Sequence, residues 1–256
     1  MIIRFLGTHN AESRNTRLAS FLIDNILAVD AGSLASELSF SEQREIKAIL
    51  LSHGHYDHIK GIPALVFNNQ QQTVKVFATA QTLEILASHL IDGVIYPKFT
   101  EKNSFLEKPA IELNALEPFK LENIEGYRVL TVPVNHPIGG MGFEITDEEG
   151  RKIFYTGDTG PGLSSIWEHV SPHLLITDAT FPNRLKNVAQ DSGHLCPEML
   201  AAELTEFRRV KGYIPQVVLV HLSPQLEGEI RKEVCDIASE LMFSINIARE
   251  GDEFDI

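Results

Sequence analysis

The stretch His53-Gly54-His55-Tyr56-Asp57-His58 is the most informative part of the sequence, because it places four metal-binding side chains within six residues. It follows the apolar run Ile46–Leu51, which is typical of a strand buried on both faces. Imidazole nitrogens and a carboxylate suit Zn²⁺ or a similar first-row ion. Four ligands from so short a stretch would crowd a single ion, and the cluster therefore predicts two adjacent metal ions. A polar turn that is merely His-rich is the alternative, and it is disfavoured because imidazoles this dense need partners.

Length and composition indicate an ordinary globular protein. The 256 residues can enclose a sizeable core, and 43% of them are hydrophobic and 22% charged. The net charge of −13 disfavours a general grip on nucleic acid, which depends on Lys and Arg. The two cysteines fit a reducing compartment. The apolar run at Met1–Gly7 is too short for a secretory signal, and no stretch approaches the roughly 20 apolar residues of a membrane span. We therefore expect a cytoplasmic protein without membrane or nucleic-acid partners.

Short β-rich runs alternate with helical patterns along the chain, which predicts a layered α/β fold. The segment Ile91–Leu121 carries Pro97, Pro109 and Pro118 and is predicted to be an irregular connection over the active site. No internal repeat or linker is visible, so residues 1–256 are predicted to form a single domain. The expected strands are Ile2–Leu6, Ser20–Ile23, Ile26–Val29, Ile46–Leu51, Thr73–Ala78, Tyr127–Val134, Gly142–Ile145, Lys152–Thr156, Leu174–Thr177 and Val217–Val220, and the expected helices are Gln81–Leu90, Pro197–Phe207 and Glu227–Phe243.

Further candidate ligands stand directly after strand-like runs, next to Gly or Pro. They are His136, Asp158, Asp178 and His221. A lone His or Asp in such a place is more often a capping or core group. A fold that gathers strand ends along one edge would bring all of them to the first cluster.

These motifs, taken together, resemble those of the metallo-β-lactamase-fold hydrolases. The matching elements, in the family's order, are Asp30-Ala-Gly32, the His53–His58 cluster, His136, Gly157-Asp-Thr159 and His221. The chain is more closely similar to the class II cyclic-nucleotide phosphodiesterases and their bacterial relatives. That similarity rests on Tyr96-Pro-Lys-Phe-Thr100, Val132-Pro-Val-Asn-His136, Gly157-Asp-Thr-Gly-Pro161, Thr180-Phe-Pro-Asn183, Ser192-Gly-His-Leu-Cys-Pro197 and His221-Leu-Ser-Pro224.

The resemblance implies a four-layer αβ/βα sandwich with the metal site at one edge, between the two sheets. It implies that one ion is held by His53, His55 and His136, a second by Asp57, His58 and His221, and that Asp158 bridges the two. Two divalent ions are the expected cofactors, with Zn first and Mn or Fe as alternatives.

The activity that the resemblance implies is hydrolysis of a small phosphodiester, with 3′,5′-cyclic AMP first, by a hydroxide that bridges the metals. Asp57 would orient that hydroxide. Asp178 and His194 occupy the positions of a carboxylate–histidine pair shared with the tRNA 3′-processing ribonucleases, although this chain has Asp where those relatives often have Glu. His194 would donate the proton to the leaving group, and Asp178 would fix its tautomer.

Other functions remain open at this point. A tRNA 3′-processing ribonuclease is disfavoured by the net charge of −13, and a thioester hydrolase of the glyoxalase II type by the Asp178–His194 pair. A di-iron redox or gas-binding protein on the same fold would be coloured, whereas a zinc enzyme would not. A homodimer is expected from the resemblance alone.

Several aromatic residues and one further histidine have weaker indications. Tyr96, Phe99 and Phe181 are candidates for a base-binding pocket, with core packing as the simpler explanation. His9 is expected on the surface rather than at the metal edge.

Overall fold

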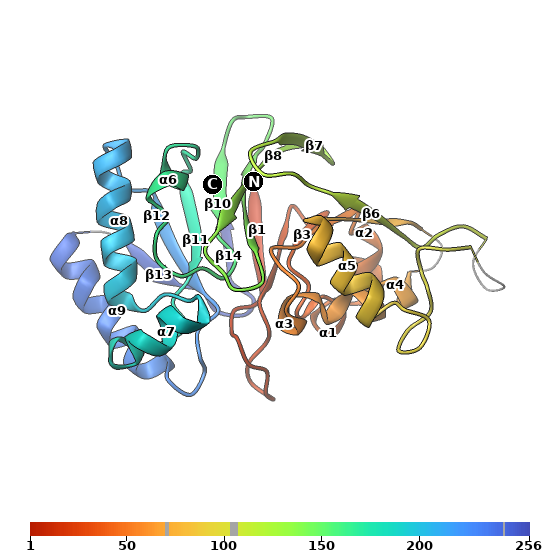
Figure 1. Cartoon of the computed structure of the whole chain (residues 1–256), viewed down its shortest axis with the longest axis horizontal. Helices are drawn as coiled ribbons and strands as arrows, with labels where there is room; N and C mark the ends of the chain where they lie inside the picture. The colour runs from red at the N-terminus through yellow and green to blue at the C-terminus, as the bar shows by residue number, and fades with distance from the viewer. Residues whose placement is uncertain (70–71, 103–106, 243) are drawn as a thin grey trace.

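The computed structural model describes residues 1–69, 72–102, 107–242 and 244–256. Two mixed seven-stranded β-sheets pack face to face at its centre (Figure 1). The first sheet has the order β14 (Glu253–Asp255), β1 (Ile2–Gly7), β2 (Ser20–Ile23), β3 (Leu27–Val29), β4 (Ala48–Leu50), β5 (Val74–Ala78) and β6 (Ile111–Ala115). The second has the order β13 (Ile245–Ile247), β12 (Gln216–Val220), β11 (Leu174–Asp178), β10 (Lys152–Tyr155), β9 (Gly140–Thr146), β8 (Tyr127–Val134) and β7 (Leu121–Ile124).

Helices cover the outer face of each sheet, as Figure 1 shows. The first sheet carries α1 (Leu34–Glu37), α2 (Phe40–Glu45), α3 (Tyr56–Ile59), α4 (Gly61–Asn68) and α5 (Ala80–His89). The second carries α6 (Ser164–Trp167), the 3₁₀ turn η1 (Asn183–Leu185), α7 (Lys186–Ser192), α8 (Pro197–Lys211) and α9 (Glu227–Leu241). The predicted four-layer αβ/βα sandwich is thereby confirmed.

Three apolar clusters hold the layers together. The middle one lies between the sheets and contains Phe5, Val29, Phe143 and Ile176, all almost fully buried. The other two fill the spaces between each sheet and its helices. Burial on both faces explains why β4 is apolar throughout and β11 begins with three apolar residues, without a polar alternation.

Most predicted strands lie within one or two residues of their expected ends, and β8 spans the predicted Tyr127–Val134. The prediction of an irregular connection is wrong for Ile111–Ala115, which forms β6 and pairs in parallel with β5. One of its five residues is buried, two are half-buried and two are exposed, as expected of an edge strand. Figure 1 places this segment at the outer edge of the first sheet, beside α5.

The helix predicted to run to Phe243 ends at Leu241, and Phe243 lies outside the described residues, as do 103–106 of the predicted connection. Within the described ranges, no helix combines the length and the apolar character needed to cross a membrane.

One edge of the sandwich collects the carboxyl ends of β3, β4, β8, β10, β11 and β12, and we call it the ligand edge. The hairpin turns that precede β3, β8 and β10 lie at the opposite end of those strands, which we call the turn edge. Two residues at the ligand edge, Asp30 and His221, have left-handed backbones with φ of 52° and 60°. Such conformations are costly for residues other than glycine and are concentrated at functional sites.

Candidate metal centre

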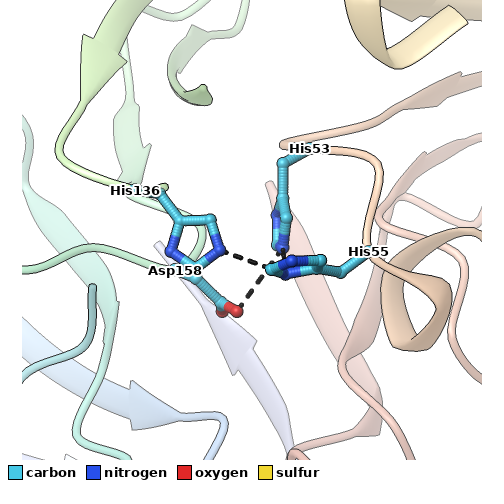
Figure 2. Close-up of side chains that lie close together, drawn as sticks. All are labelled: His53, His55, His136 and Asp158. Atoms are coloured by element: carbon cyan, nitrogen blue, oxygen red, sulfur yellow. Dashed lines mark hydrogen bonds and ion pairs between the residues drawn. The ribbon is translucent and has the colours of Figure 1, made fainter. Parts of the chain in front are cut away.

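The predicted ligands come from four separate segments that meet at the ligand edge. His53 and His55 follow β4, and His55 is the N-cap residue directly before α3, which carries Asp57 and His58. His136 follows β8, Asp158 follows β10 and His221 follows β12. Figure 2 shows His53, His55, His136 and Asp158 pointing toward one another from different parts of the chain. The strand ends thus bring together what the sequence separates by up to 168 positions.

The first ligand group consists of His53, His55, His136 and Asp158. His55 Nδ1 lies 2.9 Å from His53 Nε2 and 3.1 Å from His136 Nε2. Asp158 Oδ2 lies 3.6 Å from His53 Nε2. Atoms bound to one tetrahedral Zn²⁺ at about 2.0–2.1 Å are roughly 3.3 Å apart. The spacing within this group therefore suits a single ion.

The second ligand group consists of Asp57, His58 and His221. His221 Nε2 lies 3.1 Å from Asp57 Oδ2 and 3.3 Å from His58 Nε2. Asp158 Oδ2 is 3.3 Å from His58 Nε2, so the same carboxylate borders both groups. Asp158 therefore lies between the two ligand groups.

The charges at the site fit a cation. Asp158 is 2% exposed, and its Oδ1 accepts no hydrogen bond from any described residue, although His221 Nδ1 is 3.4 Å away. Burial would raise the pKa of Asp158, but the charges of His221 and His58 hold it well below its usual range. An ionised, buried carboxylate with an unused oxygen needs a positive partner.

The imidazoles of the first ligand group are suited to donate lone pairs. Burial lowers the pKa of His53 well below its usual value, and the neighbouring imidazole of His58 lowers it further. Burial likewise lowers the pKa of His55 and that of His136. Neutral imidazoles are the form that coordinates metal ions, so the donor set fits divalent metals.

Hydrogen bonds from behind the site orient the ligand rings. His58 Nδ1 donates to Asp30 Oδ2 at 2.7 Å, and His136 Nδ1 donates to the Gly193 carbonyl at 3.0 Å. In both rings this leaves Nε2 free to face the ligand edge, which is the usual function of such partners. Burial would lower the pKa of His58, but the charges of Asp158 and Asp30 outweigh it and raise that pKa well above its usual value.

Two glycines make the close packing at the edge possible. A Cβ on Gly54 would lie 2.7 Å from Ile85 Cδ1 of α5, so the turn between His53 and His55 has no room for a side chain. Gly157 has φ of +64°, and a Cβ there would lie 2.7 Å from Ser52 Cβ.

A second acid–base pair lies beside the ligands. Asp178, at the end of β11, has its Oδ2 3.1 Å from His194 Nδ1. Burial lowers the pKa of His194, but the hydrogen bond and the charge of Asp178 outweigh it and raise that pKa. His194 offers a ring nitrogen within 4.8 Å of ligand atoms of Asp158 and His221. The shorter Asp side chain thus still reaches the histidine.

The weaker predictions have mixed outcomes. The expectation of a surface position for His9 is wrong, because the residue is 6% exposed and its Nδ1 lies 2.7 Å from Glu250 Oε1. Phe99 is a core residue beneath the helices of the first sheet, and Tyr96 packs against the same cluster. Phe181 packs on the core of the second half but also contacts the ring of His194, with centroids 5.9 Å apart. Of the three aromatic candidates, only Phe181 therefore lies at the site.

Sequence reasoning did not single out the residues that support the ligands from behind. They are Ser52, Tyr155, Thr180 and the carbonyl of Gly193, and Asp30 was recognised without a contact being assigned to it. Thr180 Oγ1 donates to the His221 carbonyl at 2.9 Å, and His221 Nδ1 lies 3.1 Å from the same hydroxyl.

The model of the β-lactamase superfamily domain matches residues 20–222, which is most of the chain and includes every predicted ligand. The chain belongs to the β-lactamase superfamily domain family. It is therefore a member of a hydrolase family with the metallo-β-lactamase fold, and its His/Asp cluster could hold metal.

Curated relatives within this superfamily carry two kinds of name. A probable 3′,5′-cyclic-nucleotide phosphodiesterase of Yersinia pestis is 22% identical over 217 residues, which cover 74% of this chain but only 61% of that protein. A 3′,5′-cyclic-nucleotide phosphodiesterase of Aliivibrio fischeri is 24% identical over 241 residues, covering 76% and 72% of the two chains. A ribonuclease Z of Methanocaldococcus jannaschii is 28% identical over 290 residues, covering 90% and 88%.

Solved structures share the fold over the whole length. Unliganded yeast PDE1 has a TM-score of 0.84 at 17% identity, covering 100% of this chain and 99% of its own. The short form of human tRNase Z has a TM-score of 0.71 at 19% identity, also covering 100% and 99%. At such low identities these likenesses show the fold alone.

Proposed function

We propose that this protein is a metal-dependent phosphodiesterase that hydrolyses a small phosphodiester, with 3′,5′-cyclic AMP as the first substrate to test. The observation that carries the proposal is the pair of ligand groups on either side of the buried Asp158, with the Asp178–His194 pair beside them. The names of the Yersinia and Aliivibrio relatives support the choice of a cyclic nucleotide.

Two divalent ions fit the site, Zn²⁺ first, with Mn²⁺ or Fe²⁺ as alternatives. His53, His55 and His136 would hold one ion, and Asp57, His58 and His221 the other, with Asp158 shared. When bound, such a pair of ions polarises phosphoryl oxygens and lowers the pKa of water toward neutrality.

Asp57 would orient the attacking water. Its side chain is 26% exposed, so it borders both the ligands and solvent. Burial would raise the pKa of Asp57, but the hydrogen bond from His221 and the charge of His58 lower it to about 2. The carboxylate therefore stays ionised and able to accept a hydrogen bond from water.

His194 is placed to supply the proton for the leaving oxygen. The side chain is 12% exposed, and Asp178 holds its Nδ1. That contact leaves Nε2 as the ring atom available to a substrate. Because Asp178 raises the pKa of His194, the ring holds its proton to a higher pH than an ordinary imidazole does.

The charge around the site favours a small substrate. Lys60, two residues after His58, is paired with Glu12, and Arg184 lies 3.0 Å from Glu229. Both basic side chains are thus neutralised by acidic partners, and the net charge of −13 likewise disfavours binding of a polyanion. A cyclic nucleotide carries one charge and needs no such surface.

The test is hydrolysis of 3′,5′-cyclic AMP by protein loaded with Zn²⁺ or Mn²⁺, with Asp158→Ala as the blank. Turnover in the usual range of about 1–10³ s⁻¹, absent from the blank, is the expected result. No turnover by protein that has taken up both ions would contradict the choice of substrate.

The second candidate is a ribonuclease of the tRNA 3′-processing type. It is favoured by the ribonuclease Z similarity, which covers 90% of the chain. Cleavage of a precursor tRNA by the same loaded protein, with cyclic AMP left intact, would select this function. A visible absorption band of the purified protein would instead select di-iron redox or gas-binding chemistry.

A further inference from the structure

We propose that Tyr155 is a positioning residue for the second ligand group, acting through Asp30 on His58. Its hydroxyl donates to Asp30 Oδ2 at 2.7 Å, and His58 Nδ1 donates to the same oxygen at 2.7 Å. Tyr155 touches no predicted ligand in this chain of contacts, so its effect passes through the shared carboxylate.

The contact joins the two halves of the sandwich. Tyr155 ends β10 of the second sheet, and Asp30 follows β3 of the first. Their side chains are 1% and 0% exposed, so the hydrogen bond is made out of water. Within the second ligand group, Asp57 and His58 come from the first half of the chain and His221 from the second. The buried hydrogen bond between Tyr155 and Asp30 therefore helps to fix the distance between His58 of the first half and His221 of the second.

Asp30 depends on its donors for a fixed orientation. Its Oδ1 accepts from the Ser52 backbone N–H at 2.8 Å, and its Oδ2 accepts from the Ser52 hydroxyl at 2.8 Å. Among the described residues, Tyr155 donates the only hydrogen bond to the Asp30 carboxylate that comes from the second sheet. Without the phenol, the carboxylate loses its anchor on that side while still facing His58.

Tyr155 is suited to be a permanent donor. Burial and the charge of Asp30 raise the pKa of its phenol well above the usual value, so the hydroxyl stays protonated. The ring packs edge-on against Phe21, with centroids 5.2 Å apart, so Tyr155→Phe removes the hydroxyl and keeps the packing.

The turn edge offers a matched control. Tyr127 of β8 also reaches from the second sheet to a carboxylate of the first, with its hydroxyl 2.5 Å from Asp24 Oδ2. Asp24 precedes β3 and Asp30 follows it, so the two pairs lie at opposite ends of one strand. Tyr127→Phe removes the same atom from the same kind of contact, away from the ligands.

The experiment is a titration of metal-free protein with Co²⁺ alone, followed by the visible absorption of the bound ion, which responds to its ligand geometry. The His221→Ala variant assigns the steps: the Co²⁺ binding step that is lost in this variant belongs to the second ligand group. Partners behind metal ligands typically change metal affinity 10–100-fold. We expect Tyr155→Phe to weaken that step about tenfold and shift its absorption band, with the other step unchanged. Tyr127→Phe is expected to leave both steps as they are.

A double-mutant cycle shows whether the effect passes through Asp30. In an Asp30→Asn background, Tyr155→Phe is expected to cause little further loss of affinity, because the oxygen that they share is already altered. Tyr155→Phe protein that binds both ions as tightly as the wild type, or loses both steps equally, would overturn the proposal. Additive losses of affinity in the double mutant would also overturn it, because they would mean that Tyr155 does not act through Asp30. The inference rests on the metal-binding part of the proposed function. Wild-type protein that takes up no Co²⁺ would refute that part. Intact binding of both ions by Tyr155→Phe would refute only the role of Tyr155.

Discussion

The ligand edge and the turn edge both gather carboxylates at the ends of the same strands, yet they balance these charges differently. At the turn edge, Asp147 lies against Arg151, with Oδ2 2.6 Å from Nε, and Asp24 receives the Tyr127 hydroxyl. At the ligand edge, Asp158 is surrounded by imidazoles and has an oxygen without a hydrogen bond. The turn edge is complete with protein groups alone. The ligand edge instead keeps a buried carboxylate oxygen that no described group satisfies, and a cation held by the ligand groups could satisfy it.

The largest effect is expected from replacing Asp158, the carboxylate at the centre of the ligand edge. Asp158→Ala removes the carboxylate shared by both ligand groups, so the protein is expected to lose bound metal and at least about 10³-fold in phosphodiesterase turnover, since metal ions contribute several kcal/mol to such a barrier. Elemental analysis and the cyclic AMP assay measure the two losses. Asp147→Ala at the turn edge is the control and keeps both properties. An Asp158→Ala protein that retains metal and turnover would refute the assignment.

His194→Asn separates chemistry from metal binding at the same edge. The variant keeps the ligands but loses the ring that would carry the proton, so a loss of about 10²-fold or more in kcat is expected with both ions retained. The measurement is kcat together with metal content. Unchanged kcat, or lost metal, would remove His194 from the proposed acid–base role.

Asp147→Ala is expected to cost stability without affecting function. Asp147 Oδ1 accepts backbone N–H bonds from Glu149 and Arg151, and the substitution leaves those donors without it. We expect a loss of about 1–3 kcal/mol in the free energy of unfolding, measured with denaturant on the metal-free protein. A loss of ion binding instead would mean that the two edges are not independent.

The same variant gives a pH test. Burial would raise the pKa of Asp147, but the hydrogen bonds and charge of Arg151 lower it below the ordinary 3.8. A lowered folded pKa adds stability above the unfolded pKa, and this contribution disappears as the pH falls through the folded value. The stability difference between wild type and Asp147→Ala should therefore be constant above about pH 5 and shrink below pH 4. A difference that grows on acidification would contradict this sign.

His9 is a useful contrast to the candidate metal ligands, because both of its ring nitrogens already face carboxylates of the protein. Its Nδ1 lies 2.7 Å from Glu250 Oε1 and its Nε2 3.4 Å from Glu227 Oε2. Burial lowers the pKa of His9, but these two carboxylates outweigh it and raise that pKa above 6.5. The added stability is present below the unfolded pKa and is lost as the pH rises through the folded one.

His9→Gln should therefore be less stable than the wild type by about 1 kcal/mol near pH 6, with a smaller difference at pH 9. Both ions should still bind. Unfolding curves at the two pH values and one metal analysis check these outcomes. Loss of an ion in His9→Gln would make His9 part of the metal centre.

The contrast also explains what the sequence could predict. The ligands were predictable because metal chemistry restricts residue types and because strand ends share an edge, so the clustered His53–His58 motif and scattered residues such as Asp158 and His221 point to one place. The strands with apolar runs, such as β4 and the start of β11, were predictable because both faces are buried.

What the sequence could not predict depends on contacts between distant segments. The Gly193 carbonyl behind His136 and the Tyr155 hydroxyl behind Asp30 carry no pattern in their own neighbourhoods. His9 looks like a loop residue, but its backbone pairs with Leu18 and Leu222, two segments that are distant in the sequence from each other. The edge strand Ile111–Ala115 is only partly buried, and its mixed polarity resembles that of a loop.

The count of divalent ions bound per chain tests the central claim most directly. Metal-free wild-type protein and Asp158→Ala would be titrated with Zn²⁺ and analysed for metal after removal of the unbound ions. The account predicts two ions per wild-type chain and a loss of both in Asp158→Ala. A wild-type chain that retains no ion, or a variant that retains two, would contradict it.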